Sequence, residues 1–406
     1  MWFEEGDEEL LFPDNWKLNF ADEIMRVTDI GEGGIEKAFQ SPIGTKRIAE
    51  IAQGRKNAVI AIDDISRPTP TFRLINHVIQ ELEQGGIDHS EIKVIIASGA
   101  HRQSTRMELI NKIGRSVLER INIIHHVPYE NLVDLGNTKY GTPVKTNRDF
   151  YEGDLKIAIG SIMPHPTAGF GGGRKLISIG LSSVETLRAF HKRDEGWFRT
   201  GFVKGNIQHE DLDEIMHKVG LDVVVEVILT GKSGIGALLV GDPVKCFEDG
   251  VEKAWKTYRT TMPKGNDIVV INAYPKDLDL LQAFNALWVA LFPNMDIVRN
   301  GGTIVCTAAC PEGEGLHYLS SYGMSDPVWF SESGFQGRDV FIFSPNLNNY
   351  DLNKHFPMSV IGFQKWNDLL MELQKKHGDY AQVTVLPCGP LHLNPANYGM
   401  GAVPAL

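Results

Sequence analysis

The sequence has 406 residues, a formal net charge of −11 and a hydrophobic fraction of 42%. This length exceeds what one hydrophobic core usually supports, so two domains are expected. The acidic balance and the lack of a basic block argue against a nucleic-acid partner, and the lack of a run of about 18 apolar residues argues against a membrane span.

The first part of the chain alternates apolar runs with helical stretches. Three short apolar runs are expected to form strands, at residues 56–62, 91–97 and 154–162. Helices are expected at 71–84, where Gly85 and Gly86 follow, and at 104–120. Short apolar strands that alternate with helices predict a mostly parallel sheet with helices on both faces.

The alternation starts again after a polar segment with proline and glycine at 260–267. Four further strands are expected, at residues 267–273, 301–309, 339–345 and 382–388. A helical stretch at 279–292 lies between the first two of them. We therefore predict an α/β protein with two α/β domains, residues 1–260 and 261–406, and an active site in the cleft between them.

The cysteines and the N-terminus indicate a reducing compartment. The cysteines are Cys246, Cys306, Cys310 and Cys388, and their spacing matches neither a CxxC motif nor a zinc-knuckle set. Buried, reduced thiols are the expected state. The first residues are acidic and lack the basic and apolar regions of a signal peptide, so a cytoplasmic protein is expected.

Three polar clusters follow the predicted strands of the first domain, with the sequences DDISRPTP (63–70), SGAHR (98–102) and PHPTAGFGGGRK (164–175). Ligands of open α/β sheets bind beyond the carboxyl ends of the strands, so a site is expected there. Glycines in the third cluster allow backbone N–H groups to approach a phosphate or a flat ring closely. Their spacing fits neither a Walker A loop nor a dinucleotide fingerprint, and a tight strand-to-helix turn is the alternative.

Histidines close to these clusters are candidates for proton transfer or metal binding. His101 and His165 follow strand ends, and His191 lies further along the chain. Imidazole exchanges protons near neutral pH and binds borderline metals such as nickel or zinc. The adjacent pair His125 and His126 is instead expected to be structural, at a strand edge and turn.

Lys175 and Arg67 are the candidate cationic groups. Arg174 is expected to lower the pKa of its neighbour Lys175, which favours covalent chemistry through the amine. Arg67 lies in a loop stiffened by prolines, and a fixed guanidinium suits a carboxylate or phosphate. The alternative for this loop is a helix start capped by Thr69 or Thr71.

These three clusters, together with AFH at 189–191, resemble the lactate racemase family, whose members use a nickel pincer nucleotide. The resemblance continues at YPKDLDLLQAFNAL (274–287) and CPEGEG (310–315). It implies a Ni(II) pyridinium-3,5-bisthiocarboxylic acid mononucleotide that is joined to Lys175 through a thioamide bond. It also implies that His191 is the nickel ligand from the protein, and that enzymes of cofactor biosynthesis act on this chain as partners.

The resemblance further implies that His101 and His165 are paired catalytic histidines, with Asp64 near them. One histidine takes the proton of the C2 hydroxyl, hydride passes from C2 to the cofactor and returns to the other face, and the opposite histidine reprotonates the oxygen. The cofactor is expected to lie along Gly171, Gly172 and Gly173, with its phosphate held by backbone N–H groups.

Arg67 and Gln282 match positions on the substrate side, and the second domain is expected to supply Gln282 and close over the cofactor. Lactate racemases carry a lysine three residues after this glutamine, whereas this chain has Asn285. We therefore predict a small-molecule 2-hydroxy acid other than lactate, for example a larger or polyhydroxylated acid such as an aldonate.

Two alternatives stay open from the sequence. One is a non-catalytic sensor of a 2-hydroxy acid or nucleotide, which turnover would exclude. The other is a zinc-dependent hydrolase or lyase with His101, His165 and His191 as ligands, which the identity of the metal would decide.

Overall fold

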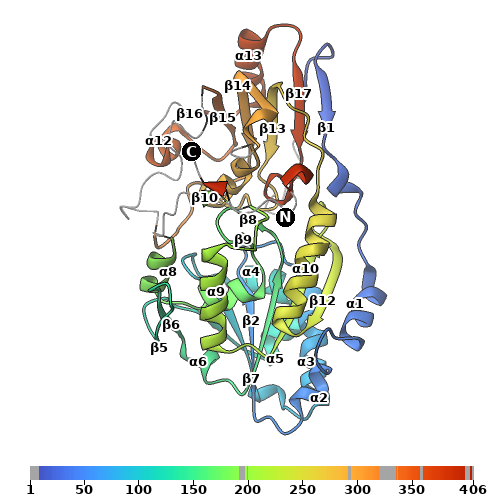
Figure 1. Ribbon diagram of the computed structural model, residues 1–406, viewed down its shortest axis with the longest axis vertical. Helices are drawn as coiled ribbons and strands as arrows, with labels where there is room; N and C mark the ends of the chain where they lie inside the picture. Colours follow the sequence, from blue (N-terminus) through green and yellow to red (C-terminus); the bar gives the residue numbers. More distant parts are fainter. Residues whose placement is uncertain are drawn as a thin grey trace. The chain divides into compact units, whose positions relative to one another are not determined.

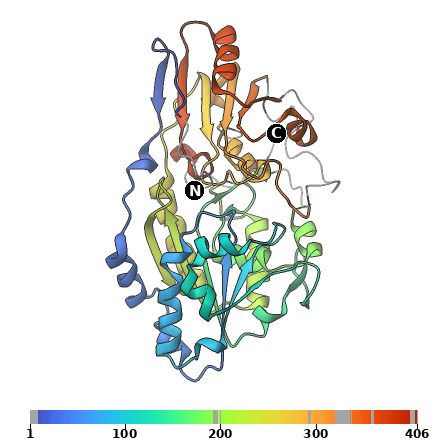
Figure 2. The same cartoon turned by 180° about the vertical axis from the view of Figure 1, so that it is seen from behind.

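The computed structural model describes residues 9–191, 197–198, 200–290, 294–319, 335, 337–356, 360–397 and 403–404. The chain forms two compact units, drawn in Figure 1 and from behind in Figure 2. The central unit consists of Val27–Thr257 together with Gly401–Pro404. The terminal unit combines the segment that ends at Arg26 with Tyr258–Met400.

The N-terminal segment differs from the predicted domain range 1–260, because it belongs to the terminal unit. Here β1 (Lys17–Phe20) pairs in parallel with β17 (Gln382–Leu386). The pairing satisfies backbone groups of β1 that would otherwise be left to water. The local sequence pattern does not show which strand β1 pairs with when its partner is so distant along the chain. The prediction therefore placed these residues in the first domain.

The central unit contains a mostly parallel sheet with the strand order β12-β11-β7-β2-β3-β4. Its strands are β2 (Ala58–Asp63), β3 (Ile92–Ala97), β4 (Asn122–His125), β7 (Leu155–Ser161), β11 (Val223–Leu229) and β12 (Ile235–Gly241). Only the β11–β12 pair of this sheet is antiparallel among the described residues. The predicted strands at 56–62, 91–97 and 154–162 are confirmed as β2, β3 and β7. Every residue of β2 is buried, as a continuous apolar run in a parallel sheet requires.

The strand order reverses between β2 and β7. The chain passes from β2 outward through β3 to β4, and it then returns to the other side of β2 with β7. Ile62 of β2 lies opposite Ile159 of β7, so the two strands end side by side. Such a reversal opens a crevice at the carboxyl ends of the strands, where open α/β sheets bind ligands.

Helices cover both faces of the central sheet, as Figures 1 and 2 show. They are α1 (Gly31–Gln40), α2 (Ile48–Ala52), α3 (Ile75–Gln84), α4 (Arg106–Ile113), α5 (Arg115–Arg120), α6 (Arg148–Tyr151), α7 (Gly173–Lys175), α8 (Val184–His191), α9 (Ile207–Val219) and α10 (Pro243–Tyr258). The predicted helix 104–120 is divided into α4 and α5 because Gly114 has a φ of 87°, which ends α4. The predicted helix 71–84 begins with a 3-10 turn, Thr71–Arg73, that leads into α3.

Three short strand pairs accompany this sheet, and all are antiparallel. They are β5 (Leu132–Asn137) with β6 (Pro143–Asn147), β8 (Pro164–His165) with β9 (Gly169–Phe170), and β10 (Trp197–Phe198) with β18 (Val403–Pro404). The β8–β9 pair carries the glycine-rich segment that leads into α7, and β18 brings the end of the chain to β10.

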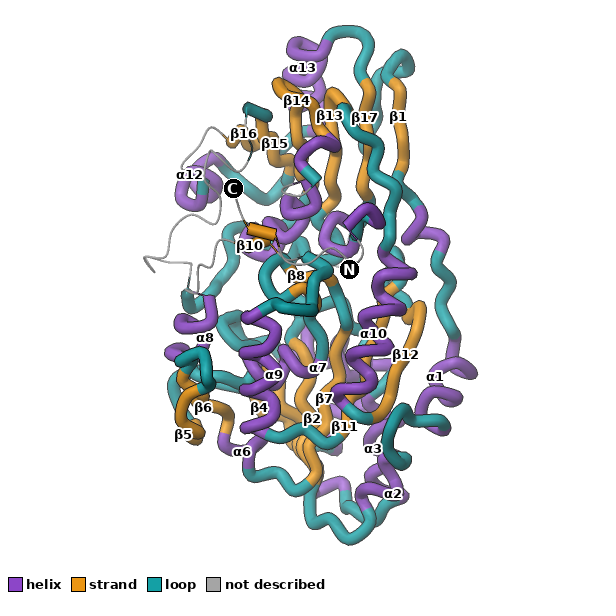
Figure 3. Tube along the Cα trace, in the orientation of Figure 1, coloured by secondary structure: helices purple, strands orange, loops and turns teal. Residues whose placement is uncertain are grey.

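The terminal unit contains a parallel sheet with the strand order β1-β17-β13-β14-β15-β16, drawn in orange in Figure 3. Its other strands are β13 (Asn266–Asn272), β14 (Val298–Thr307), β15 (Asp339–Phe343) and β16 (Val360–Phe363). The four predicted strands are confirmed as β13, β14, β15 and β17, whereas the short edge strand β16 was not predicted. The accompanying helices are α11 (Leu280–Ala283), the 3-10 helix η5 (Phe284–Ala290), α12 (Asn349–His355) and α13 (Trp366–His377).

Alternate residues of β13 pack into two separate apolar clusters. Val269 and Ile271 belong to one cluster, and Ile268 and Val270 belong to the other. Successive side chains of a strand point to opposite faces, so each face of the terminal sheet has its own core. The four cysteines are buried and free, as predicted. Within the described ranges, no helix is long and apolar enough to span a membrane.

Candidate active site

His101 and Asp64 form a hydrogen-bonded pair at the carboxyl edge of the central sheet. Asp64 directly follows β2, and His101 lies in the loop after β3. The His101 Nδ1–H group donates to Asp64 Oδ2 at 2.8 Å. A carboxylate oxygen only accepts, so the Nδ1 atom of His101 carries a proton and Nε2 is left with a lone pair when the ring is neutral. A neutral His101 ring can therefore accept a proton at Nε2.

The charge of Asp64 is well stabilised in this place. Burial raises the pKa of Asp64, whereas the charge and hydrogen bond of His101 lower it. The Arg67 charge and a hydrogen bond from Ser66 lower the pKa further, to well below its usual range. Arg67 Nη1 also donates to Ser66 Oγ at 2.8 Å. The loop after β2 thus places an arginine beside the Asp64–His101 pair.

A buried ion pair between Lys112 and Asp63 fixes the loop after β2. The Lys112 ammonium of α4 lies 2.6 Å from Asp63 Oδ1, and it donates to the backbone oxygens of Arg67 at 3.0 Å and Thr69 at 3.2 Å. Thr69 Oγ1 contacts Asp63 and lies 2.6 Å from Ser161 Oγ on β7. Lys112 thus combines an ion pair with Asp63 and two hydrogen bonds to the loop backbone. Sequence reasoning missed Lys112, because a single lysine in an amphipathic helix gives no signal.

The threonine cap proposed for this loop is wrong. The 3-10 turn Thr71–Arg73 is preceded by Pro70, and no side chain caps it. The Thr69 hydroxyl instead donates a hydrogen bond to the Asp63 carboxylate, as described above. The loop is fixed by side-chain hydrogen bonds to the sheet rather than by a capping motif.

His165 has the opposite proton arrangement to His101. Its Nδ1 atom accepts hydrogen bonds from the backbone N–H groups of Ala168 at 3.1 Å and Thr167 at 3.3 Å. An acceptor nitrogen carries no proton, so Nε2 of His165 carries it. A neutral His165 ring therefore has its N–H group at Nε2, the reverse of a neutral His101 ring.

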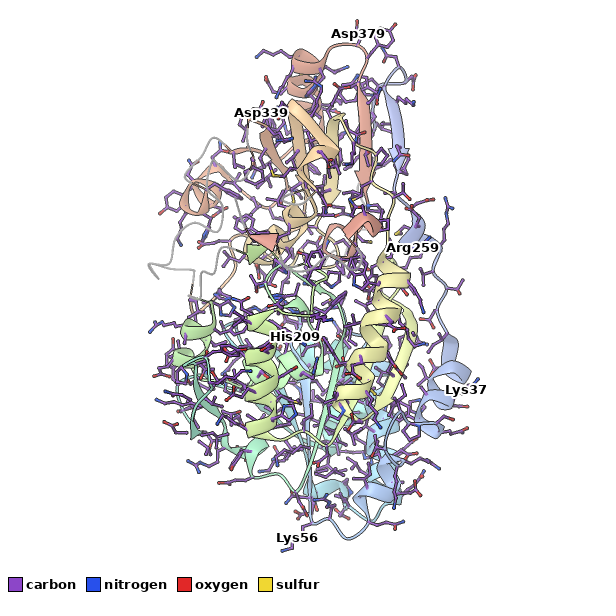
Figure 4. The ribbon with its side chains drawn as sticks, in the orientation of Figure 1. Lys37, Lys56, His209, Arg259, Asp339 and Asp379 are labelled. Carbon is purple, nitrogen blue, oxygen red and sulfur yellow. The ribbon has the colours of Figure 1, made fainter. Side chains whose placement is uncertain are left out.

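Lys175 follows the glycine loop and is surrounded by site residues. Burial is the main cause that lowers the pKa of Lys175, to about 7; the Arg67 charge lowers it too, and the Asp64 charge raises it. The predicted fall in pKa is confirmed, but Arg174 is not its cause. Arg174 is buried, and its guanidinium lies 2.8 Å from Asp213 Oδ1 and 3.0 Å from Nε2 of His209 on α9. His209 is labelled in Figure 4.

We expect the Lys175 amine to become reactive near pH 7 rather than near pH 10.5. Only the neutral amine is nucleophilic, and it predominates above the pKa of about 7. Site-resolved mass spectrometry of the apo protein acetylated at pH 6 to 11 measures this midpoint. The exposed lysines Lys37 and Lys56, which Figure 4 labels, serve as internal controls. A Lys175 midpoint equal to theirs would contradict the prediction.

His191 is the last residue of α8. Its Nδ1–H group donates to Leu187 O at 2.7 Å, so Nε2 carries the lone pair that a metal would need. Although part of the side chain is exposed, desolvation by the surrounding protein lowers the pKa of His191 to about 4, and the charges of Lys175 and His101 contribute. The ring is therefore neutral at pH 7, as a metal ligand must be. His191 and Lys175 thus fit the two attachment points of the expected cofactor.

The expected phosphate cradle at Gly171, Gly172 and Gly173 is partly contradicted. The Gly171 amide donates to Met163 O at 2.8 Å, and the Gly173 amide donates to Glu226 Oε1 at 2.6 Å. These two amides already have partners within the protein. The prediction failed because the backbone of this loop is paired with distant residues that the local sequence does not show.

Gln282 and Asn285 belong to the terminal unit, whereas the cluster described above consists of residues of the central unit. Asp279 Oδ1 caps α11 by accepting from the Gln282 amide at 2.7 Å. The Asn285 side-chain Nδ2 donates to Gln282 O at 2.8 Å. Both residues lie just beyond the carboxyl end of β13, the equivalent edge of the terminal sheet.

The structural interpretation of the adjacent histidines is confirmed. His126 is buried, its Nε2 donates to Ser182 O at 2.8 Å, and burial lowers its pKa to about 4. His125 Nε2 accepts from the Ser104 amide at 3.1 Å. Across the described part of the chain, no group of three or more His, Cys, Asp or Glu side chains is arranged to hold a metal ion.

The chain is similar in sequence to known proteins. The sequence profile of the lactate racemase N-terminal domain matches residues 3–196. The chain is 30% identical to a lactate racemase of Lactiplantibacillus plantarum, over 87% of this chain and 89% of that protein. It is 29% identical to a lactate racemase of Thermoanaerobacterium thermosaccharolyticum, over 79% of this chain and 71% of that protein.

Two solved structures share the fold. The lactate racemase apoprotein from Thermoanaerobacterium thermosaccharolyticum superimposes with a TM-score of 0.74 at 23% identity and covers 94% of both chains. A protein from Thermotoga maritima gives a TM-score of 0.65 at 15% identity and covers 88% of this chain and 97% of its own. The relatives in sequence extend over most of this chain, and the chain therefore belongs to the lactate racemase family and is a racemase-type isomerase.

Proposed function

We propose that this protein inverts C2 of a small 2-hydroxy acid with a nickel pincer nucleotide attached to Lys175. The observation that carries the proposal is the different surroundings of the two histidines: Nδ1 of His101 faces the Asp64 carboxylate, whereas Nδ1 of His165 accepts from backbone N–H groups. Inversion at one carbon needs a base and an acid that act on the same oxygen from two sides. A simple binding protein needs neither.

His101 takes the C2 hydroxyl proton at Nε2 in one direction, and Asp64 stabilises the imidazolium that forms, through the 2.8 Å hydrogen bond to Nδ1. His165 supplies a proton from its own Nε2, and the two residues exchange roles in the reverse direction. Arg67, beside this pair, would hold the substrate carboxylate and so keep that end of the substrate in place while C2 reacts. Gln282 of the terminal unit would contact the substrate.

The cofactor would be held by Lys175, through its weakly basic amine, and by His191, whose Nδ1–H group is engaged by Leu187 O and whose Nε2 atom would face the metal. When bound, it supplies a hydride acceptor and donor for C2. Cofactor-making enzymes would act as partners during maturation, and the protein would work in the cytoplasm.

Asn285 is expected to determine substrate choice. Replacing it with lysine (Asn285→Lys) should raise turnover of lactate by about 10-fold or more, because a cation then replaces a neutral amide near the substrate. Turnover of both lactate enantiomers by the loaded protein measures the effect, and Asn285→Gln is the matched control without charge. Equal lactate turnover in all three proteins would show that position 285 does not select the substrate.

The proposal is tested first by intact mass and metal analysis of protein co-expressed with the cofactor-making enzymes. We expect about one nickel ion per chain and added mass on Lys175. A panel of 2-hydroxy acids in D2O then identifies the substrate, and return of the same hydride predicts little deuterium at C2. Zinc in place of nickel would support a hydrolase or lyase, and metal-free, unmodified protein would support a sensor.

A further inference from the structure

A buried carboxyl group lies beneath the glycine loop. Glu226 on β11 is 0% exposed, and its Oε1 atom accepts the 2.6 Å hydrogen bond from the Gly173 amide. Its Oε2 atom has no hydrogen-bond partner within the described part of the chain. No step of the proposed reaction uses this residue, although it contacts the segment that carries Lys175.

The glycines around this carboxyl group provide the space that it fills. A Cβ atom on Gly172 would lie 3.0 Å from Glu226 Oε1, and one on Gly173 would lie 3.1 Å from the same atom. Gly160 is the residue of β7 paired with Glu226, and a Cβ atom there would lie 3.8 Å from Oε2. The contacts at Gly172 and Gly173 are tighter than side chains normally tolerate. The glycine loop is therefore shaped by a protein side chain on its inner side.

The carboxyl group also lies at the start of a helical segment. Gly173 begins α7, which continues into a π-helical turn at Leu176–Gly180. An acceptor at the first amide of a helix satisfies a donor that the helix itself leaves open. Burial raises the pKa of Glu226 to about 7, the Gly173 hydrogen bond and the Arg174 charge lower it, and the Asp63 charge raises it. The Glu226 charge in turn contributes to the raised pKa of the Cys246 thiol, of which burial is the main cause.

We propose that Glu226 is a positioning residue, which fixes the backbone at Gly172 and Gly173 and thereby presents the Lys175 amine to the cofactor. The inference rests on the proposed attachment at Lys175. The geometry explains the connection, because the Gly173 amide and Lys175 belong to the same helical turn. Arg174 lies between Gly173 and Lys175 in the chain, and its side chain is held by Asp213 and His209. The direction of the Lys175 side chain therefore depends on the backbone of this turn.

Two near-isosteric variants separate the hydrogen bond of Glu226 from its charge. Glu226→Gln removes the charge but keeps an oxygen that can accept from Gly173, whereas Glu226→Asp keeps the charge but is one methylene too short. The assay is acetylation of full-length apo protein with an N-hydroxysuccinimide ester of acetate. The neutral Lys175 amine attacks the ester carbonyl, N-hydroxysuccinimide leaves, and the proton of the amine passes to water.

In wild type, the pH midpoint of Lys175 labelling is expected near 7. Glu226→Asp should raise this midpoint by about 1 pH unit or more, because a displaced amine regains hydration, and Glu226→Gln should leave it unchanged. Lys37 and Lys56 report general changes in the same sample. Asp211→Asn is the matched control, because it removes a buried carboxylate that accepts from Thr142 Oγ1 at 2.6 Å instead of from the loop.

An unchanged midpoint in Glu226→Asp would overturn the proposal, and so would an equal shift in both variants, since charge rather than reach would then be the cause. A purely structural role would lower the melting temperature without moving Lys175 relative to the other lysines. Because the assay uses apo protein, it can be read even if the nickel proposal fails. In co-expressed protein, Glu226→Asp should also reduce the fraction of chains modified at Lys175 by about 5-fold or more, with Glu226→Gln close to wild type.

Discussion

Lys175→Ala protein that is co-expressed with the cofactor-making enzymes will carry neither added mass nor nickel, and it will show no turnover above background. Desolvation by the surrounding protein and the Arg67 charge make the Lys175 amine weakly basic, and the adjacent Arg174 cannot replace it. Arg174 is engaged by Asp213, and a guanidinium stays protonated in any case. Lys175→Arg should therefore fail as completely as Lys175→Ala.

Intact mass, nickel content and circular dichroism of the same preparations measure this result. The matched control is Lys56→Ala, which removes an exposed lysine far along the chain from the glycine loop and should load fully. Added mass on the Lys175→Ala protein would contradict the assignment of the attachment site. Nickel bound without added mass would show that His191 holds the metal while the covalent bond forms elsewhere or not at all.

Replacing Lys112 with methionine should destabilise the protein by about 3–5 kcal/mol, because it leaves the buried Asp63 carboxylate without its cation. Burial already raises the pKa of Asp63, and the Lys112 charge and hydrogen bond oppose that effect. The variant should also release the loop after β2, since the backbone oxygens of Arg67 and Thr69 lose their donor. Urea unfolding measures the free energy of unfolding.

Two control variants show whether the loss of stability comes from the unpaired Asp63 charge. The double variant with Asp63→Asn and Lys112→Met removes both charges and should recover most of the free energy of unfolding. Lys264→Met breaks the exposed pair of Lys264 with Asp296 at 2.5 Å, and it should cost less than about 1 kcal/mol. A Lys112→Met protein as stable as Lys264→Met would show that the buried pair contributes little.

The local sequence pattern predicted much of the fold. Continuous apolar runs indicated β2, β3 and β7, because a strand buried on both faces of a parallel sheet has no polar side. The same pattern indicated β13, β14, β15 and β17 in the terminal unit. It missed β1 as a partner of β17, because the pairing joins opposite ends of the chain.

In the site, too, local motifs were the basis of the predictions, and partners distant along the chain were missed. Polar clusters after strands were predicted to meet, and Asp64 and His101 do meet at 2.8 Å, because parallel strands bring their carboxyl ends to one edge. The buried partners Lys112 and Glu226 were missed. Each acts on a segment about fifty residues away in the chain, and neither belongs to a motif.

The sequence by itself determined which chemical groups are available and which strands carry them, because apolar periodicity and strand-end motifs are local properties. Only the tertiary structure decided the state of those groups. The tautomers of His101 and His165 depend on which donors and acceptors face Nδ1, and the low pKa of Lys175 depends on burial and on Arg67. Likewise, the amides of Gly171 and Gly173 are engaged by Met163 and Glu226, partners that only folding brings to them.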